Sequence, residues 1–291
     1  MRSLTEILLP TDFSPRSADV VHYALGVARH FHSKVTLLHV LAPFNPAWAA
    51  IGSAAVVEEV LAQQREETCK RLHAFFKEEL GDVALKRIVL EGDPAEVITT
   101  YCTSERVGLV MMPTRGGSAF RRFLLGSVTA KVLHDLTCPV WTSSHVTDGH
   151  ATVSVIPKVI VCASDLTPDG DRILQWATNL ASDLQARLII AHAIPSLEFN
   201  PASYFLEADM RKARIGDAHA TISKALKGFQ RPDAEVRVEG GNVSTVVRSI
   251  VEDSRADLLI IGRASDRGML GRLRTHSYDL IRESPCPVMS I

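Results

Sequence analysis

The sequence predicts an α/β protein with two tandem domains, each a doubly wound, open parallel sheet of five strands. Three observations predict this fold class. The chain has 291 residues, which is enough for about two domains. Short runs rich in Ile, Leu and Val alternate with longer helical segments, and these runs lack the period-two pattern of half-exposed strands. The same alternation also occurs twice along the chain.

An internal repeat relates the two halves. The matched segments are ILLPTDFSP (7–15) with IVCASDLTP (160–168), KVTLLHV (34–40) with RLIIAHA (187–193), EGDPAEVI (91–98) with EGGNVSTV (239–246), GLVMMP (108–113) with DLLIIG (257–262), and CPV (138–140) with CPV (286–288). Asp12 thus corresponds to Asp165 at an offset of 153 (165 − 12). The polar segment 142–155 between the halves is typical of a linker. We expect one domain over 1–145, a linker over 146–156 and a second domain over 157–291.

Start signals place the helices of the first copy. Ser14 is suited to cap a helix that Pro15 opens, and Asp93 with Pro94 gives a comparable start further on. The mixed-charge segment 54–80 is typical of a long surface helix. The expected elements are, in order, a strand at 4–10, a helix from 15, a strand at 34–41, a helix over 54–80, a strand at 83–90, a helix from 94, a strand at 107–112, a helix over 128–136 and a strand at 139–142.

The second copy repeats this order. Its strands are expected near 157–163, 187–194, 234–239, 257–261 and 287–290. Strands that alternate with helices imply right-handed crossovers and a parallel sheet. Cys138 and Cys286 each precede a proline and are expected to be small buried apolar groups.

The stretch MMPTRGGSAFRRFLLGSV (111–128) carries the main chemical signal. Gly116 and Gly117 allow close approach of backbone N–H groups to an anion, and Gly126-Ser127 precedes a predicted helix whose N-terminus favours negative charge. Ser127 is suited either to cap that helix or to bond a phosphate oxygen. Three arginines, Arg115, Arg121 and Arg122, add positive charge. A plain turn with solvated arginines is the alternative.

Two further features fall at the same edge of the expected sheet. Asp12 follows the first strand and Val40 lies at the end of the second, while the glycine-rich stretch follows the fourth. In open parallel sheets, ligands bind beyond the carboxyl ends of the strands, where the strand order reverses. The combination favours phosphate binding. His39 and His192 end the second strand of each copy, and we interpret them as packed, hydrogen-bonded imidazoles instead of metal ligands.

Other functional classes find little support in the sequence. A net charge of −1 argues against general binding of nucleic acid, and no window approaches the length of a membrane span. There is no Walker A loop, no GxGxxG and no HExxH, and we assign no catalytic or metal-binding residue. The five cysteines are scattered without a CxxC, which is typical of reduced thiols and predicts a cytoplasmic protein.

The repeated pattern, ILLPTDFSP…LLHV…EGDP…MMPTRGGSAFRRFLLGSVTAKVL…CPV, resembles the universal stress protein family, as a tandem member over almost the whole chain. The resemblance implies the Rossmann-like, adenine nucleotide α-hydrolase-like form of the fold, and ATP, alone or with Mg²⁺, as ligand. The family's signature is Gly, two residues, Gly, nine residues, then Gly-Ser or Gly-Thr. Gly116 and Gly126-Ser127 match it, whereas Pro113 replaces the first glycine. The resemblance implies a nucleotide site made by Thr11, Asp12, Val40, Met112, Pro113, Arg115, Gly116, Gly126, Ser127, Val128 and Thr129.

The second copy departs further from this signature. Asp165 and Gly262 are retained, but Ser265 stands at the second glycine. Counting back from the second CPV at an offset of 148 (286 − 138), Arg274-Thr275 stands where Gly126-Ser127 stood. An arginine at that position would crowd a phosphate. We therefore expect a degenerate second site that binds nucleotide weakly or not at all.

Three functions are consistent with these residues. The first is a stress-response regulatory protein that binds ATP in its first domain and hydrolyses it slowly at most. The second is a nucleotide-independent scaffold that acts through protein contacts. The third is an enzyme of the related adenine-binding α/β superfamily that transfers an adenylyl group or cleaves a bond next to AMP. It ranks last because no acidic or nucleophilic group accompanies the cradle. The resemblance further implies that the two domains pack as a pseudo-dimer, and it allows a homodimer of such chains.

Overall fold

The computed structural model describes residues 4–43, 54–77, 83–115, 125–143, 156–194, 204–263 and 272–291. The chain divides into two compact units, Arg2–Trp141 and Thr142–Ile291, which are called the first and second copies below. Apart from Ile156, the expected linker lies outside the described residues.

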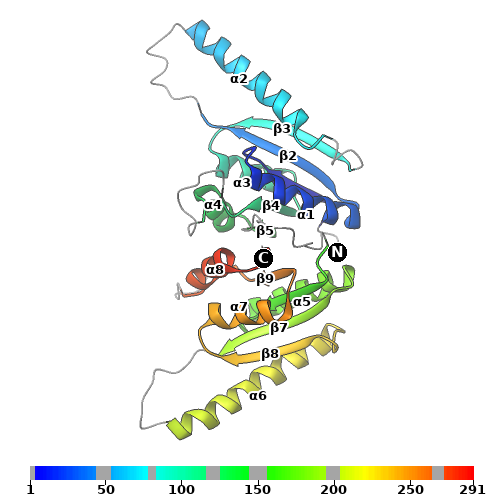
Figure 1. Cartoon of the computed structure of the whole chain (residues 1–291), viewed down its shortest axis with the longest axis vertical. Coiled ribbons are helices and arrows are strands. Elements are labelled where there is room, and N and C mark those ends of the chain that lie inside the picture. The colour runs from blue at the N-terminus through cyan, green and yellow to red at the C-terminus, as the bar shows by residue number, and fades with distance from the viewer. Residues whose placement is uncertain are drawn as a thin grey trace. The chain divides into compact units, whose positions relative to one another are not determined.

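The helices and strands alternate in both copies (Figure 1). The first copy contains β1 (Glu6–Pro10), α1 (Pro15–Phe31), β2 (Lys34–Leu41), α2 (Ala54–Ala74), β3 (Leu85–Glu91), α3 (Pro94–Ser104), β4 (Leu109–Pro113), α4 (Ser127–Asp135) and β5 (Val140–Ser143). The second contains β6 (Val159–Ala163), α5 (Pro168–Asp183), β7 (Arg187–Ile194), α6 (Tyr204–Gly228), β8 (Glu235–Gly240), α7 (Val243–Ser254), β9 (Leu258–Ile261), α8 (Arg272–Glu283) and β10 (Val288–Ser290).

Each copy forms a doubly wound sheet, as the sequence predicted. The strand order is β3-β2-β1-β4-β5 in the first copy and β8-β7-β6-β9-β10 in the second. In the first copy Ile7 of β1 pairs in parallel with Val35 of β2 on one side and with Leu109 of β4 on the other. The chain therefore reverses direction across the sheet between β1 and β4, and between β6 and β9 in the second copy.

The central strands are buried on both faces, which explains their continuous apolar runs. Ile7 and Leu8 of β1 and Leu109 and Val110 of β4 are fully buried. Because helices cover both faces of a parallel sheet, successive side chains of one strand enter two different apolar layers. Alternation with polar residues is therefore absent from these strands.

The predicted helix starts are confirmed for α1 and α3. Ser14 caps α1 and accepts a hydrogen bond from Ser17 N, and Pro15 is the first helical residue. Asp93 caps α3 by accepting from Glu96 N at 3.0 Å. The second copy uses Thr167 and Asn242 in the same way for α5 and α7.

Helix α2 is long, as predicted, and it ends at Ala74 instead of residue 80. Its C-terminal turn is fixed by Arg87 of β3, whose Nε donates to the Leu72 carbonyl at 2.9 Å. Arg71 lies over the ring of Phe13 at 4.3 Å. The N-terminal turns of α2 extend past the edge of the sheet (Figure 1), and Val56 and Val60 there are about half exposed.

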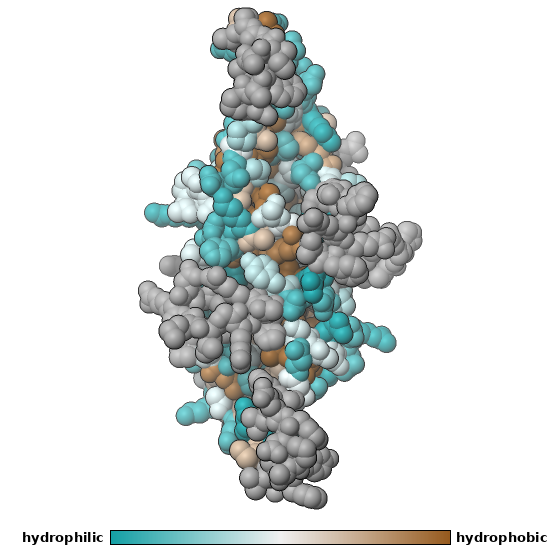
Figure 2. Space-filling model, turned by 90° about the vertical axis from the view of Figure 1, so that its left-hand side faces the viewer, coloured by the Kyte–Doolittle hydropathy of each residue, from teal (hydrophilic) through white to brown (hydrophobic). Residues whose placement is uncertain are grey.

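The described surface mixes hydrophilic and hydrophobic residues. On the face drawn in Figure 2, hydrophobic groups are small and are separated by hydrophilic side chains. No helix in the described part of the chain combines the length and the apolar character needed to cross a bilayer.

Candidate functional site

The turn after β1 holds Asp12 in a fixed orientation. Its Oδ1 accepts hydrogen bonds from Ser14 N at 2.9 Å and from Ser17 Oγ at 2.7 Å. The hydroxyl of Thr11 accepts from Phe13 N at 3.0 Å, and Phe13 adopts a left-handed φ of 60°. The Asp12 side chain is exposed at the carboxyl end of the strand. The turn thus presents a carboxylate to solvent at the point where the strand order reverses.

His39 fixes the same turn from β2. Its Nδ1 lies 2.8 Å from the Thr11 carbonyl oxygen, and its ring lies 4.5 Å from that of Phe13. Since a carbonyl only accepts, Nδ1 carries the proton. His192 makes the matching 2.7 Å bond to the Ser164 carbonyl in the second copy. The interpretation of both residues as hydrogen-bonded imidazoles is confirmed.

The main chain of Val40 faces the space beyond β1. The Leu38 carbonyl accepts from Thr11 N at 2.9 Å, on the β1 side, and the Leu41 carbonyl accepts from Gly92 N at 3.0 Å, on the β3 side. Main-chain groups of a central parallel strand point alternately to its two neighbours. Val40 therefore directs its N–H and C=O toward β1, just past the point where the β1–β2 pairing ends, beside Asp12.

The connection from β4 to α4 closes on itself. Gly126 N donates to the Thr114 carbonyl at 2.9 Å, so the chain returns to its starting point at the strand end. A Cβ on Gly126 would lie 3.3 Å from the Cα of Arg115. Glycine is therefore suitable at position 126 because the two backbones approach closely there. Its φ is negative and does not require a glycine. Gly116 lies outside the described residues, as do Gly117, Arg121 and Arg122.

Among the residues that the structure describes, no side chain caps the start of helix α4. Gly126 is its N-cap residue and Ser127 is its first helical residue, so the first alternative for Ser127, a helix cap, is wrong, and the second, a bond to a phosphate oxygen, stays a prediction. The first-turn N–H groups of an α-helix have no partner one turn back, and they carry partial positive charge. The amides of Ser127 and Val128 are therefore suited to an anion. By contrast, α1, α3, α5 and α7 each begin with a capping side chain.

Thr129 has a structural bond at the same place. Its side chain is buried, and its hydroxyl donates to the Pro113 carbonyl at 3.1 Å. Pro113 is the last residue of β4 and is buried, like Met112 before it. Since β1 and β4 are adjacent, the fold brings the Asp12 turn, Val40 and the start of α4 to one edge. Among the described residues, no cluster of three or more His, Cys, Asp or Glu could hold a metal ion.

The second copy keeps the acidic turn and changes the helix start. Asp165 Oδ1 accepts from Thr167 N at 3.1 Å and from Thr167 Oγ1 at 2.7 Å. Helix α8 begins at Arg272, so Arg274 and Thr275 lie inside its first turn instead of at its start. Ser277 Oγ bonds the Gly262 carbonyl at 3.3 Å, as Thr129 bonds Pro113. Ser265 lies outside the described residues.

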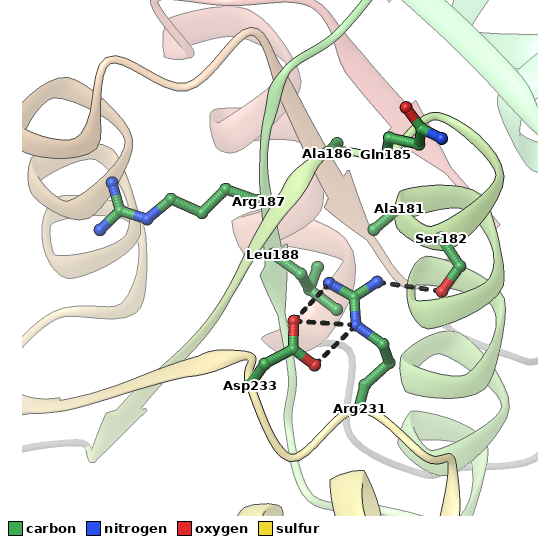
Figure 3. A pocket seen from close by; sticks show the side chains of 8 residues that line it. All are labelled: Ala181, Ser182, Gln185, Ala186, Arg187, Leu188, Arg231 and Asp233. Carbon is green, nitrogen blue, oxygen red and sulfur yellow. Dashed lines mark hydrogen bonds and ion pairs between the residues drawn. The ribbon is translucent and has the colours of Figure 1, made fainter.

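A cavity of about 600 Å³ lies elsewhere, at the amino end of β7 (Figure 3). Arg231 lies across it and is bound to Asp233 by a 2.9 Å ion pair and to Ser182 Oγ by a 3.0 Å hydrogen bond. The side chain of Arg187 points away from this group. These contacts join the end of α5 to the turn after α6. The cavity is at the opposite end of the strands from the Asp165 turn, and we assign it no role in the candidate site.

The fold and site define a tandem α/β protein with an acidic turn after the first strand of each copy and an uncapped helix start in the first. The chain belongs to the universal stress protein family, whose sequence profile matches residues 4–143 and 157–291. A universal stress protein of Mycolicibacterium smegmatis is 25% identical over 298 aligned residues, covering 100% of this chain and 99% of the relative. Universal stress protein MJ0531 of Methanocaldococcus jannaschii is 32% identical over 137 residues, 46% of this chain and 79% of that protein.

A solved structure extends the similarity to the whole fold. The crystal structure of a universal stress protein from Archaeoglobus fulgidus matches 98% of this chain and 95% of its own, with a TM-score of 0.65 at 23% identity. The tandem arrangement of two such domains is therefore shared with a solved protein and with a relative of full length.

Proposed function

We propose that the first copy binds ATP and that the second copy does not, so that the chain acts as a nucleotide-responsive regulator in a stress response. The observation that carries the proposal is the uncapped start of α4 at Gly126, beside the exposed Asp12 turn. Asp12 and the Val40 main chain would hold the adenosine part. The amides that follow Gly126 would hold the phosphates, with Arg115 and Gly116 on the adjoining loop.

Pro113 is compatible with this proposal. A proline at the end of β4 lacks an N–H, but its carbonyl keeps the bond from Thr129. The donors offered to a phosphate come from the far end of the loop, at Ser127 and Val128. Mg²⁺ would arrive bound to the phosphates, because no cluster of acidic side chains among the described residues could hold it alone. Any hydrolysis would be slow for the same reason.

The extended α8 supports the degenerate second site. In α4 the helix starts at Ser127, whereas in α8 the equivalent Thr275 is the fourth helical residue. An N–H at this depth is available to an intrahelical carbonyl, unlike the amides of Ser127 and Val128 at the start of α4. This observation also favours, for the second copy, the scaffold function that needs no nucleotide.

Compartment and assembly are part of the proposal. The cysteines are scattered and form no CxxC motif, which agrees with a cytoplasmic protein. Tandem members would pack their two domains as a pseudo-dimer, and a homodimer of such chains would present two nucleotide sites.

Nucleotide release tests the proposal directly. The purified full-length protein is denatured and the supernatant is assayed for adenine nucleotide, and the thermal midpoint of the same preparation is measured with and without Mg-ATP. Released nucleotide or a raised midpoint is expected, because a ligand that binds the folded state alone stabilises it. If no nucleotide is released and the thermal midpoint does not rise, the nucleotide-independent scaffold becomes the supported function. Formation of AMP and pyrophosphate on long incubation would instead indicate an adenylyl-transferring enzyme.

A further inference from the structure

Phe13 follows Asp12 in the turn after β1, and its backbone adopts a left-handed φ of 60°. This conformation is unfavourable for a bulky side chain, so contacts elsewhere must compensate for it. In the same turn, Phe13 N donates to the Thr11 hydroxyl at 3.0 Å and Ser14 N donates to Asp12 Oδ1 at 2.9 Å. The orientation of the Asp12 carboxylate therefore depends on the conformation of Phe13.

Aromatic and cationic side chains hold the ring of Phe13. Its centroid lies 4.5 Å from that of the His39 imidazole on β2 and 5.5 Å from that of Phe75, which meets it edge-on just after α2. The Arg71 guanidinium of α2 lies over the same ring, 4.3 Å from the centroid. Edge-to-face rings attract one another, and a cation is attracted to an aromatic face. The ring is therefore held between β2 and the end of α2.

The end of α2 is itself fixed to the sheet. Arg87 of β3 donates from Nε to the Leu72 carbonyl at 2.9 Å and from a terminal guanidinium nitrogen to the Phe75 carbonyl at 3.3 Å. Carbonyls at the end of a helix have no intrahelical partner, and these bonds supply one. A continuous series of contacts thus runs from β3 through the end of α2 and the Phe13 ring to the Asp12 turn.

The second copy has the same turn without the ring. Leu166 stands at the position of Phe13 and has a similar left-handed φ of 58°. Asp165 and His192 repeat the acidic turn and the imidazole bond. A leucine side chain offers no aromatic face to a cation. The turn therefore forms with either residue, whereas the aromatic anchor to α2 belongs to the copy that is proposed to bind ATP.

We propose that Phe13 is a positioning residue of the nucleotide site, which holds the Asp12 carboxylate in its binding orientation through contacts with α2. The inference rests on the proposed function, in which Asp12 holds the adenosine part of ATP. Without the ring, the turn would sample other conformations more often. The apparent affinity for a ligand falls with the fraction of molecules in the binding conformation.

The first test compares the Mg-ATP affinity of the full-length protein with that of two variants, each of which lacks one ring. Phe13→Leu copies the second repeat and should weaken binding roughly fivefold, through a smaller fraction of binding-competent turns. Phe76→Leu is the matched control, because the Phe76 ring contacts Phe75 and His22 in the same aromatic cluster, with centroids 4.7 and 5.9 Å away. It should leave the affinity unchanged. Equal losses from the two variants would overturn the proposal.

A positioning role further requires that the loss pass through Asp12. In the Asp12→Ala background, Phe13→Leu should therefore cause little additional loss of Mg-ATP affinity, whereas independent effects would multiply. An additional loss as large as in the wild-type background would mean that Phe13 acts on general stability or on another part of the site, and the proposal would be wrong.

A measurement without ligand separates this proposal from the proposed function. The Ser14 amide is bonded to Asp12 Oδ1, so its hydrogen exchange, followed by NMR in ¹⁵N-serine-labelled protein, reports on opening of the turn. Exchange should be roughly fivefold faster in Phe13→Leu, as the turn opens more often, and unchanged in Phe76→Leu. If the wild type binds no Mg-ATP but Ser14 responds in this way, the proposed function fails and the positioning of the turn by Phe13 stands. Unchanged exchange at Ser14 in Phe13→Leu overturns the positioning role, whether or not nucleotide binds.

Discussion

The hydroxyl of Thr129 donates a hydrogen bond to the main-chain carbonyl of Pro113, with 3.1 Å between the two oxygens. Ser277 and Gly262 repeat this contact at 3.3 Å in the second copy. The contact thus persists in the copy whose helix start has changed. It fixes the first turn of α4 against the end of β4 in the first copy, and it is a property of the fold rather than of a ligand.

Removal of this hydroxyl should destabilise the first copy. Thr129→Val keeps the shape of the side chain and leaves a buried carbonyl without its donor, which costs about 1–3 kcal/mol. Urea unfolding of the wild type and the variant measures the difference. Thr103→Val is the matched control, because the Thr103 hydroxyl donates to Thr99 O at an exposed position. Equal losses from both variants would contradict the structural importance of the Thr129 contact.

A side chain at Gly262 should force the end of Ile173 to move unless Ile173 is shortened. A Cβ at this position would lie 2.3 Å from the Ile173 Cδ1. Gly262→Ala should therefore cost about 1–3 kcal/mol by overpacking. Adding Ile173→Val removes the clashing methyl group and should recover most of this loss. In the first copy, Val20 stands at the position of Ile173 and Pro113 at the position of Gly262. A larger residue at the strand end is thus paired there with a shorter residue on the helix. Additive losses in the double variant would exclude the steric explanation.

Asp93 should make the stability of α3 depend on pH. The Glu96 backbone N–H, and then Lys131, hold the pKa of this carboxyl below its ordinary value of 3.8. A carboxyl whose pKa is lower in the folded state stabilises the protein above pH 3.8, and this contribution is lost as the pH falls through the lowered pKa. Asp93→Asn keeps a capping side chain, as Asn242 does in α7, and removes the titration.

The stability difference between the wild type and Asp93→Asn should therefore be largest near neutral pH and should vanish in acid. Urea midpoints of both proteins across this range provide the measurement. The reciprocal change, Asn242→Asp, should introduce only the part that the backbone N–H supplies, through Thr245, because Asp279 stands at the position of Lys131. A difference that stays constant with pH would show that the carboxyl is not the stabilising group.

A carboxylate at Gly126 should abolish nucleotide binding. Gly126→Asp places negative charge at the start of α4, where the proposed phosphates would lie. Gly126→Ala adds the same Cβ, 3.3 Å from Arg115 Cα, without the charge. Titration with Mg-ATP should give a weakened affinity for the alanine variant and no measurable binding for the aspartate variant. Unchanged affinity in both would place the site elsewhere.

The two acidic turns should differ in their effect on ATP. Asp12→Ala and Asp165→Ala remove the same type of turn contact, so their effects on folding should be similar. Asp12→Ala should weaken ATP binding about tenfold or more, the size of one lost charged hydrogen bond. Asp165→Ala should leave the affinity unchanged. Equal losses of affinity would contradict the divergence of the two copies.

Much of the fold follows from local sequence signals. Apolar runs without alternation predict strands covered on both faces, and all ten predicted strands are present within about two residues. Ser14 and Asp93 predict helix starts because a short polar side chain can bond an amide of the next turn. The same reasoning failed at Ser127, because the chain closes at Gly126 N and Thr114 O, a contact between residues that the sequence places far apart.

The alignment of the two copies is also corrected by the structure. Sequence matching paired Asp93 with Gly241, whereas Asp93 and Asn242 are the equivalent caps. Gly92 and Gly241 are the equivalent glycines, with φ of 142° and 152°. The positive φ that favours a glycine occurs where the strand ends and the helix begins. A match of residue identities between the two copies does not reveal which glycine occupies that position.

By itself, the sequence determined the duplication, the order of strands and helices, and the edge of the first sheet that carries Asp12 and Gly126. Periodicity and capping act over a few residues, so they can be recognised without a structure. The tertiary structure decided that no side chain among the described residues caps α4, that a side chain at Gly262 would meet Ile173, and that Cys138 is partly exposed, against the prediction that it is buried. These features depend on contacts across the sheet and between helices, where small differences in distance determine which side chains fit and which groups bond.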